Sequence, residues 1–260
     1  MQQIFDSHAH YDDAAFDPDR AALLASLPGQ GVCGIINAAS NLASARAGIA
    51  LAAQYGYLYA AVGIHPLDAE TAPDLDNAMT QLRVLAAQPK VVAIGEIGLD
   101  FHYDVPRVIQ LPLLRRQLAL ANDLHLPVIL HDREAHGPML DLLREFRPAG
   151  VVHCFSGSVE MAREVLALGL YIGLGGATTF KNAVHPLEVA AMVPPDRLLL
   201  ETDAPYMTPV PLRGKRNDSA KIAYTAEKIA AVRGVDPQTL CNETCQNACR
   251  LFGIDAEKLG

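Results

Sequence analysis

The 260-residue chain carries 21 Lys and Arg against 29 Asp and Glu, a formal charge of -8, and half of its residues are hydrophobic. This balance argues against broad electrostatic adhesion to nucleic acid or anionic membranes, although bound metal ions would change the sign of the field inside a cleft. The length is ordinary for one α/β barrel, so we expect a single domain over residues 1–260.

Short apolar, β-branched segments recur along the chain and predict eight strands. They are Ile4–His10, Cys33–Ala38, Leu58–Ile64, Val91–Ile97, Val128–His131, Val151–Phe155, Tyr171–Leu174 and Leu198–Asp203. These segments are apolar on both faces, as expected when helices cover a parallel sheet. Eight such strands, each followed by a helix, predict an α/β fold: a closed TIM-type (β/α)8 barrel rather than an open sheet.

The segments between the strands carry helical spacing or composition. Examples are Asp19–Leu27, Leu42–Gln54, Pro106–Asn122 and Val159–Leu168. Beyond the last strand, Ala220–Arg233 and Pro237–Phe252 predict two further helices, which we expect to close the outer ring. The cysteines of the last helix, at every fourth position from Cys241 to Cys249, favour buried packing over metal binding.

The cellular compartment is also predicted from the sequence. Residues Met1–Asp6 lead straight into the first strand, so we expect no signal peptide. No apolar run approaches the roughly 18–20 residues that a membrane span needs. Five cysteines, an odd number, fit a reducing compartment better than a disulfide framework. We therefore expect a cytoplasmic protein without membrane association.

Histidine and acidic residues fall at the ends of the predicted strands. Active-site groups of TIM-type barrels come from these C-terminal ends. The six are His8, His10, Glu96, His131, His153 and Asp203. A single histidine at a strand end is more often structural, but chance does not readily place six such groups at one end of a barrel.

The first strand offers the clearest geometric argument. Side chains alternate faces along a strand, so His8 and His10 both point into the barrel together with Asp6. Two imidazoles at this spacing can bind one cation from the same side, and imidazole with carboxylate suits Zn²⁺, Mn²⁺ or similar ions. We expect Asp6 to support the site rather than to bind metal.

Six ligands exceed what one tetrahedral ion needs. Two divalent ions, roughly 3.5–4 Å apart and bridged by Glu96, account for them better and would activate water for hydrolysis. Zn²⁺, Mg²⁺ and Mn²⁺ all remain open, since these ligands accept several ions.

A family resemblance extends over nearly the whole chain. The matching motifs are Phe5–His10, Gly63–Pro66, Gly95–Asp100, Leu130–Arg133, His153–Gly157, Glu201–Tyr206, Pro209–Arg216 and Asn247–Gly253. With these motifs the chain closely resembles the TatD-type metal-dependent deoxyribonucleases of the amidohydrolase superfamily. The loop after Arg216 departs from the family pattern, because Asn217 is followed by Asp218-Ser219 where many relatives have Glu-Pro, and Cys245 stands where Thr is expected.

The resemblance implies a division of the six ligands. One metal is held by the positions of His8, His10 and Asp203, the other by those of His131 and His153, with Glu96 as the bridge. It also implies that Asp203 accepts the proton of the attacking water, which makes Asp203 and Glu96 the catalytic acids.

The resemblance also implies substrate-facing positions at His65, Arg133 and Arg213. An arginine there could hold a phosphate oxygen bidentately. His102 and Tyr103, which follow the Gly95–Asp100 motif, could either contact substrate or only form the loop above the barrel. Cys154 should face away from His153, toward a helix.

The predicted activity is hydrolysis of a phosphodiester, with DNA as the expected substrate and 3′–5′ exonuclease action favoured. The DNA assignment comes from the resemblance, because the chain has no basic stripe or aromatic ladder. One alternative keeps the metal site and cleaves amides or esters, as a D-aminoacyl-tRNA deacylase would. Another is an inactive metal-binding interaction protein, against which the intact Glu96 and Asp203 argue. The sequence indicates no protein partner.

Overall fold

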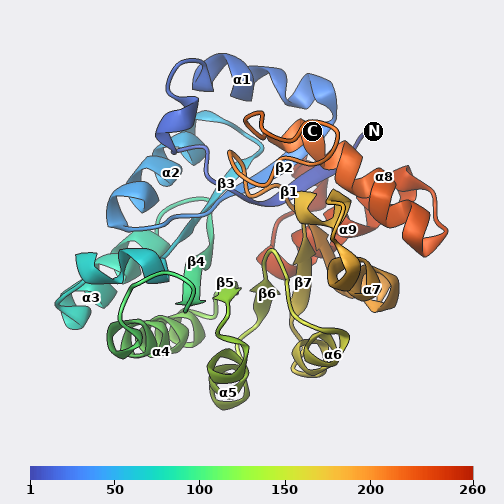
Figure 1. Ribbon diagram of the computed structural model, residues 1–260. Helices are drawn as coiled ribbons and strands as arrows, with labels where there is room; N and C mark the ends of the chain where they lie inside the picture. The colour runs from blue at the N-terminus through green and yellow to red at the C-terminus, as the bar shows by residue number, and fades with distance from the viewer. Residues whose placement is uncertain (260) are drawn as a thin grey trace.

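The computed structural model describes residues 1–259. Its sheet contains eight parallel strands that are hydrogen-bonded in chain order, with helices around them (Figure 1). The strands are β1 (Ile4–Ala9), β2 (Val32–Asn37), β3 (Leu58–Val62), β4 (Val91–Asp100), β5 (Val128–Arg133), β6 (Gly150–Val152), β7 (Tyr171–Leu174) and β8 (Leu198–Leu200).

The first and last strands meet and bring the sheet close to a closed barrel. The Ser7 hydroxyl donates to the Leu200 carbonyl at 3.0 Å. Just beyond β8, the Asp203 amide donates to the His8 carbonyl at 2.9 Å, and the His10 amide donates to the Ala204 carbonyl at 2.7 Å. The predicted TIM-type (β/α)8 fold is confirmed.

Helices follow the strands, and all but the last of them cover the outside of the barrel (Figure 1). They are α1 (Arg20–Ser26), α2 (Leu42–Gln54), α3 (Leu75–Ala86), α4 (Arg107–Leu124), α5 (His136–Phe146), α6 (Val159–Ala167), α7 (Val184–Met192), α8 (Ile222–Arg233) and α9 (Pro237–Phe252). Side-chain caps fix several starts: Asn41 accepts from two amides of α2, and Asp236 accepts from the Thr239 amide of α9.

The last helix corrects one prediction. Instead of joining the outer ring, α9 packs against inward-facing side chains near the N-terminal ends of the strands, including Phe5, Ile129 and Leu199. Its own contribution to this cluster includes Cys245 and Phe252, both nearly inaccessible to solvent. Small and aromatic side chains on this face fill the barrel end opposite the histidines, so the predicted packing role of the cysteines is confirmed.

Strand lengths differ from prediction where they matter for the site. β4 continues three residues past the predicted end to Asp100, because it stays paired with β5 up to Arg133. β6 and β8 are shorter than predicted and end at Val152 and Leu200. His153 and Asp203 therefore lie just after their strands, where strict side-chain alternation no longer applies. Within residues 1–259, no helix has both the length and the apolarity to cross a membrane.

Candidate metal centre

His8, His10 and Asp203 form the first cluster of the site. The Nε2 atoms of His8 and His10 lie 3.0 Å apart, and Asp203 Oδ1 lies 3.7 and 3.4 Å from them. His10 Nδ1 donates to the Ala38 carbonyl at 2.9 Å, so its Nε2 is left with a lone pair when the ring is neutral. The Asp203 backbone has a φ of 59°, and the hydrogen bond to His8 holds this left-handed turn in place.

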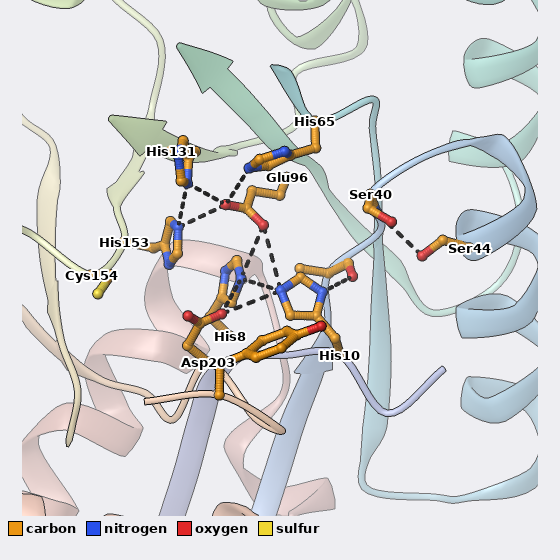
Figure 2. Close-up of polar contacts among 12 residues, drawn as sticks. His8, His10, Ser40, Ser44, His65, Glu96, His131, His153, Cys154 and Asp203 are labelled. Carbon is orange, nitrogen blue, oxygen red and sulfur yellow. Dashed lines mark hydrogen bonds and ion pairs between the residues drawn. The ribbon is translucent and has the colours of Figure 1, made fainter. Parts of the chain in front are cut away.

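Glu96 lies between this first cluster and a second one, which His131 and His153 form (Figure 2). Its Oε2 is 3.3 and 3.5 Å from Nε2 of His8 and His10. Its Oε1 is 2.8 Å from His153 Nε2 and 3.0 Å from His131 Nδ1. Each carboxylate oxygen thus faces a different pair of histidines.

His131 is positioned by its neighbour on β4. Gly98 pairs with His131, and any side chain at Gly98 would collide with the His131 carbonyl, since a Cβ would lie 1.9 Å from that oxygen. The His131 ring is held by Asp100, whose Oδ2 is 3.0 Å from Nε2. Because Asp100 accepts from Nε2, the lone pair of the His131 ring falls on Nδ1, toward Glu96, when the ring is neutral.

His153 follows β6 and is held beside Glu201. The Glu201 Oε1 atom accepts a short hydrogen bond from the Cys154 amide and lies 3.8 Å from His153 Nδ1. A Cβ at Gly173 would lie 2.4 Å from Glu201 Oε2, so a side chain there would displace the Glu201 carboxylate. Burial raises the pKa of Glu201 to about 8.

The two clusters perturb each other's titration. Burial, with the nearby His153, lowers the pKa of His8 to about 4. Burial alone would lower the pKa of His10, but the Asp203 and Glu96 carboxylates outweigh it and raise that pKa to about 10. Burial opposes ionisation of Glu96 as well, yet the surrounding histidines hold its pKa well below the usual range. Such mutual shifts are typical of functional sites.

The donor set fits divalent cations. Around an ion with bonds of about 2.0–2.1 Å, ligand atoms lie roughly 3.3 Å apart in a tetrahedron and about 2.9 Å apart in an octahedron. The distances within the first cluster, including Glu96 Oε2, run from 3.0 to 3.7 Å. In the second, Glu96 Oε1, His131 Nδ1 and His153 Nε2 lie 2.8–3.4 Å apart. If both rings of a pair are neutral, their facing lone pairs repel each other at these distances, and a cation between them would remove that repulsion.

His65 also lies beside the second cluster, but the nitrogen that it turns toward Glu96 carries a proton. Its Nε2 lies 3.5 Å from Glu96 Oε1, close enough to count among potential ligands. Its Nδ1, however, accepts from the Leu67 amide at 3.1 Å, so the uncharged ring carries its proton on Nε2. His65 is therefore a hydrogen-bond donor at this site, in keeping with a substrate-facing position.

A cavity of about 720 Å³ opens above the two candidate metal-binding clusters. His65, Tyr103 and Arg133 line it, and the Arg133 guanidinium lies 5.1 Å from the centre of the Tyr103 ring. Arg213 lies outside this cavity, in a neighbouring one. His102 is likewise not part of the lining; its Nδ1 pairs with Glu134 at 2.7 Å.

The prediction for Cys154 is wrong. This residue lines the cavity beside His153 (Figure 2) instead of facing a helix. β6 has already ended at Val152, and a φ of 43° at Cys154 turns the backbone out of the strand conformation.

Sequence reasoning missed two supporting acids, Asp100 and Glu201. Asp100 lies four residues after Glu96 on one continuous strand, a spacing that places both on the same face and could have revealed it. Asp6, expected to support the site, accepts hydrogen bonds from Thr202 and from Ser219. Ser219, part of the departure from the family pattern, is thus a buried structural residue.

Comparison with known proteins identifies the family of the chain. Residues 5–253 match the family described as TatD related DNase. The chain belongs to this family. The relative YabD of Bacillus subtilis, named an uncharacterized metal-dependent hydrolase, is 39% identical over 97% of this chain and 100% of its own length. The 3′-5′ ssDNA/RNA exonuclease TatD of Cronobacter sakazakii is 38% identical over 96% of this chain and 97% of its own.

The solved structures agree in fold. The crystal structure of YJJV, a TatD homolog from Escherichia coli K12, superimposes with a TM-score of 0.91 at 36% identity, covering 97% of this chain and 99% of that one. The chain is therefore a metal-dependent hydrolase of the TatD family, as the motifs predicted.

Proposed function

We propose that this TatD family hydrolase is a nuclease that removes nucleotides from the 3′ end of single-stranded nucleic acid with two divalent ions. The observation that carries the proposal is the position of Glu96, whose two oxygens face two separate histidine pairs 2.8–3.5 Å away. The exonuclease activity named for the Cronobacter relative supports the choice of substrate.

The roles of the residues follow from their geometry. His8, His10 and Asp203 would hold one ion, His131 and His153 the other, and Glu96 would bridge them. Bound ions would supply Lewis-acid activation of the phosphodiester and of the attacking water. Asp203 lines the cavity, and the pKa of its carboxyl lies below the usual range despite burial because His10 and His8 stabilise the anion. It is therefore ionised at neutral pH and available to accept the proton of that water.

Two further side chains face the place where the phosphodiester would lie. Arg133, stacked near Tyr103, presents a guanidinium that can bind two phosphate oxygens. His65, in the loop after β3, presents its Nε2 proton. Both donors would stabilise the negative charge that grows on the phosphate oxygens during attack.

One observation favours a second candidate, hydrolysis of a D-aminoacyl ester on RNA. Asp12, Asp13 and Asp68 also line the cavity and would attract the ammonium group of an aminoacyl substrate. A phosphodiester would instead meet these carboxylates as repelling charges unless both ions are bound.

The test is an assay of purified protein on 3′-labelled single-stranded DNA and RNA with Mg²⁺, Mn²⁺ or Zn²⁺, beside a D-aminoacyl ester. We expect stepwise shortening of the oligonucleotide, lost with chelator and with Asp203→Ala. Asp104→Ala, which removes an exposed carboxylate near the cavity, is the matched control and should keep activity. Ester hydrolysis without nucleic-acid cleavage under any metal would refute the nuclease proposal and favour the second candidate. We also propose a reducing cytoplasmic location, which the five free cysteines support.

A further inference from the structure

A second cavity of about 440 Å³ lies directly beside the cavity above the candidate metal ligands, which we call the metal cavity. Tyr206 and Met207 line both cavities, so they form the boundary between the two. The remaining walls of the second cavity come from Ala15, Pro205 and the loop Thr208–Arg216 that follows β8. The two cavities are therefore adjacent.

The two cavities differ in charge. The lining of the metal cavity includes Asp12, Asp13, Asp68 and Asp132, whereas the charged residues lining the second cavity are all basic. Basic side chains that gather beside an otherwise acidic cavity, in a chain of charge -8, indicate an anionic ligand.

The three basic side chains of the second cavity are not equivalent. Arg216 already forms an ion pair, since its guanidinium donates to both carboxylate oxygens of Asp19 at 2.7 Å. Arg213 and Lys215 are exposed, and within residues 1–259 neither forms an ion pair. Arg213 is nevertheless held in place, because its guanidinium lies 3.7 Å from the centre of the Phe180 ring. Two unpaired positive charges therefore face this space.

The loop that carries these charges is well anchored. The Val210 amide donates to Thr179 Oγ1 at 2.8 Å, and the Thr208 hydroxyl donates to the Lys215 carbonyl at 2.5 Å. At the start of the loop, Asn217 Nδ2 donates to the Tyr206 carbonyl at 2.8 Å. These bonds cross the loop at both ends, so the basic side chains start from a fixed backbone and less entropy is lost on binding.

Tyr206 itself presents an aromatic surface at the boundary. Its side chain is 55% exposed, yet its hydroxyl donates to Asp13 Oδ2 at 2.8 Å. The ring also lies near His10, with centroids 6.5 Å apart. An exposed ring held at its far end is a suitable surface for stacking a nucleobase, whatever the base.

From these features we propose that the second cavity is a phosphate subsite for single-stranded nucleic acid. With the scissile phosphodiester at the metal centre, the strand crosses Tyr206, which stacks on a base, and places a neighbouring phosphate against Lys215 and Arg213. This inference rests on the proposed nuclease function and adds to it a preference for oligonucleotides over small phosphodiesters.

The experiment compares two substrates that share the same chemistry. Bis(p-nitrophenyl) phosphate needs only the metal cavity, whereas a single-stranded DNA oligonucleotide can also reach the second one. We expect Lys215→Glu to lower kcat/KM for the oligonucleotide about three- to tenfold and to leave hydrolysis of the small diester unchanged. Lys228→Glu, the same change at an exposed lysine of α8 outside both cavities, is the control and should alter neither.

Salt dependence and the aromatic ring provide independent readouts. Loss of one phosphate contact should reduce the slope of log(kcat/KM) against log[salt] by roughly 0.7 for the oligonucleotide. Tyr206→Leu should raise KM for the oligonucleotide more than Tyr206→Phe, since phenylalanine keeps the stacking surface.

The outcomes separate the two hypotheses. Cleavage of both substrates by the wild type, with Lys215→Glu equal to wild type on each, overturns the subsite while the nuclease proposal stands. An equal loss on both substrates also overturns it, because the lysine would then act on the metal cavity. Failure of the wild type to cleave the oligonucleotide with any metal overturns the nuclease proposal and the subsite together.

Discussion

Asp100→Asn tests how the second pair of histidines is prepared for metal. Asp100 is almost fully buried, and its Oδ1 accepts from the amides of His102 and Tyr103 at 2.9 and 3.2 Å. In the variant, the asparagine oxygen would stay on these two amides and its NH₂ would point at His131 Nε2. His131 would then have to accept at Nε2 and carry its proton on Nδ1, the atom that faces Glu96. The substitution therefore fixes the ring in a tautomer that cannot bind metal.

The magnitude follows from the bond that is lost. Carboxylate partners of metal-binding histidines are typically worth 10–100-fold in metal affinity, or about 1.4–2.8 kcal/mol. That range agrees with roughly 1.5–3 kcal/mol for a hydrogen bond to a charged group. Asp100→Ala should weaken metal binding less than Asp100→Asn, although it removes more atoms, since alanine leaves His131 free to choose its tautomer.

The assay is calorimetric titration with Mn²⁺ or Zn²⁺, with thermal unfolding of the metal-free variants recorded in parallel. We expect one binding event to weaken while the other, at His8, His10 and Asp203, keeps its affinity. Asp104→Asn, an exposed carboxylate in the adjoining loop, should leave both events unchanged. Equal affinity of Asp100→Asn and wild type at both sites, or an Asp100→Ala variant that binds more weakly than Asp100→Asn, would refute the tautomer argument.

Three further predictions concern stability. Removing metal with a chelator should lower Tm by an amount that grows with the metal concentration of the reference sample, because ions bound only by the folded state stabilise it; a metal-independent Tm would contradict the site. The hydrogen bond to Asp132 raises the pKa of His136 above its unfolded value, so its stabilisation is present below about pH 6.5 and is lost as pH rises through the folded pKa; His136→Gln should therefore lower Tm at pH 6 more than at pH 9, and equal losses would refute this. Phe252→Ala should reduce the free energy of unfolding by about 3–5 kcal/mol in a denaturant titration, whereas Val108→Ala, at a side chain 77% exposed, should change it by less than about 0.5 kcal/mol.

Sequence periodicity predicted the barrel well because strands buried on both sides leave a strong local signal. Tyr171–Leu174 and Leu42–Gln54 match their elements end to end. Position at the strand ends also selected six residues that the structure brings together, since parallel strands of a barrel deliver their C-terminal residues to one place; their role as metal ligands stays a prediction. What periodicity could not supply was backbone geometry after a strand ends, as the error at Cys154 demonstrates.

Partners distant in sequence were also beyond reach. Nothing local indicates that Glu201 would accept from the Cys154 amide, 47 residues away, or that Ser219 would donate to Asp6, 213 residues away. The tail helix Pro237–Phe252 was predicted with correct bounds but with the wrong partner, because an amphipathic pattern states which face is buried and not against what. Such contacts depend on the closed barrel and emerge only in three dimensions.

The charge of the cavity links metal binding to substrate binding. Asp12, Asp13, Asp68 and Asp132 line the cavity, and Arg133 is a cation in the same lining. A phosphodiester approaching the metal-free site would be repelled by these acids, whereas two divalent ions would add four positive charges close to where the phosphate lies. Removing the ions with a chelator should therefore lower the affinity for an oligonucleotide by more than the loss of two metal–phosphate bonds alone would explain. Binding that is equally tight with and without metal would place the substrate elsewhere on the protein. It would also contradict the link between these four aspartates and metal-dependent substrate binding.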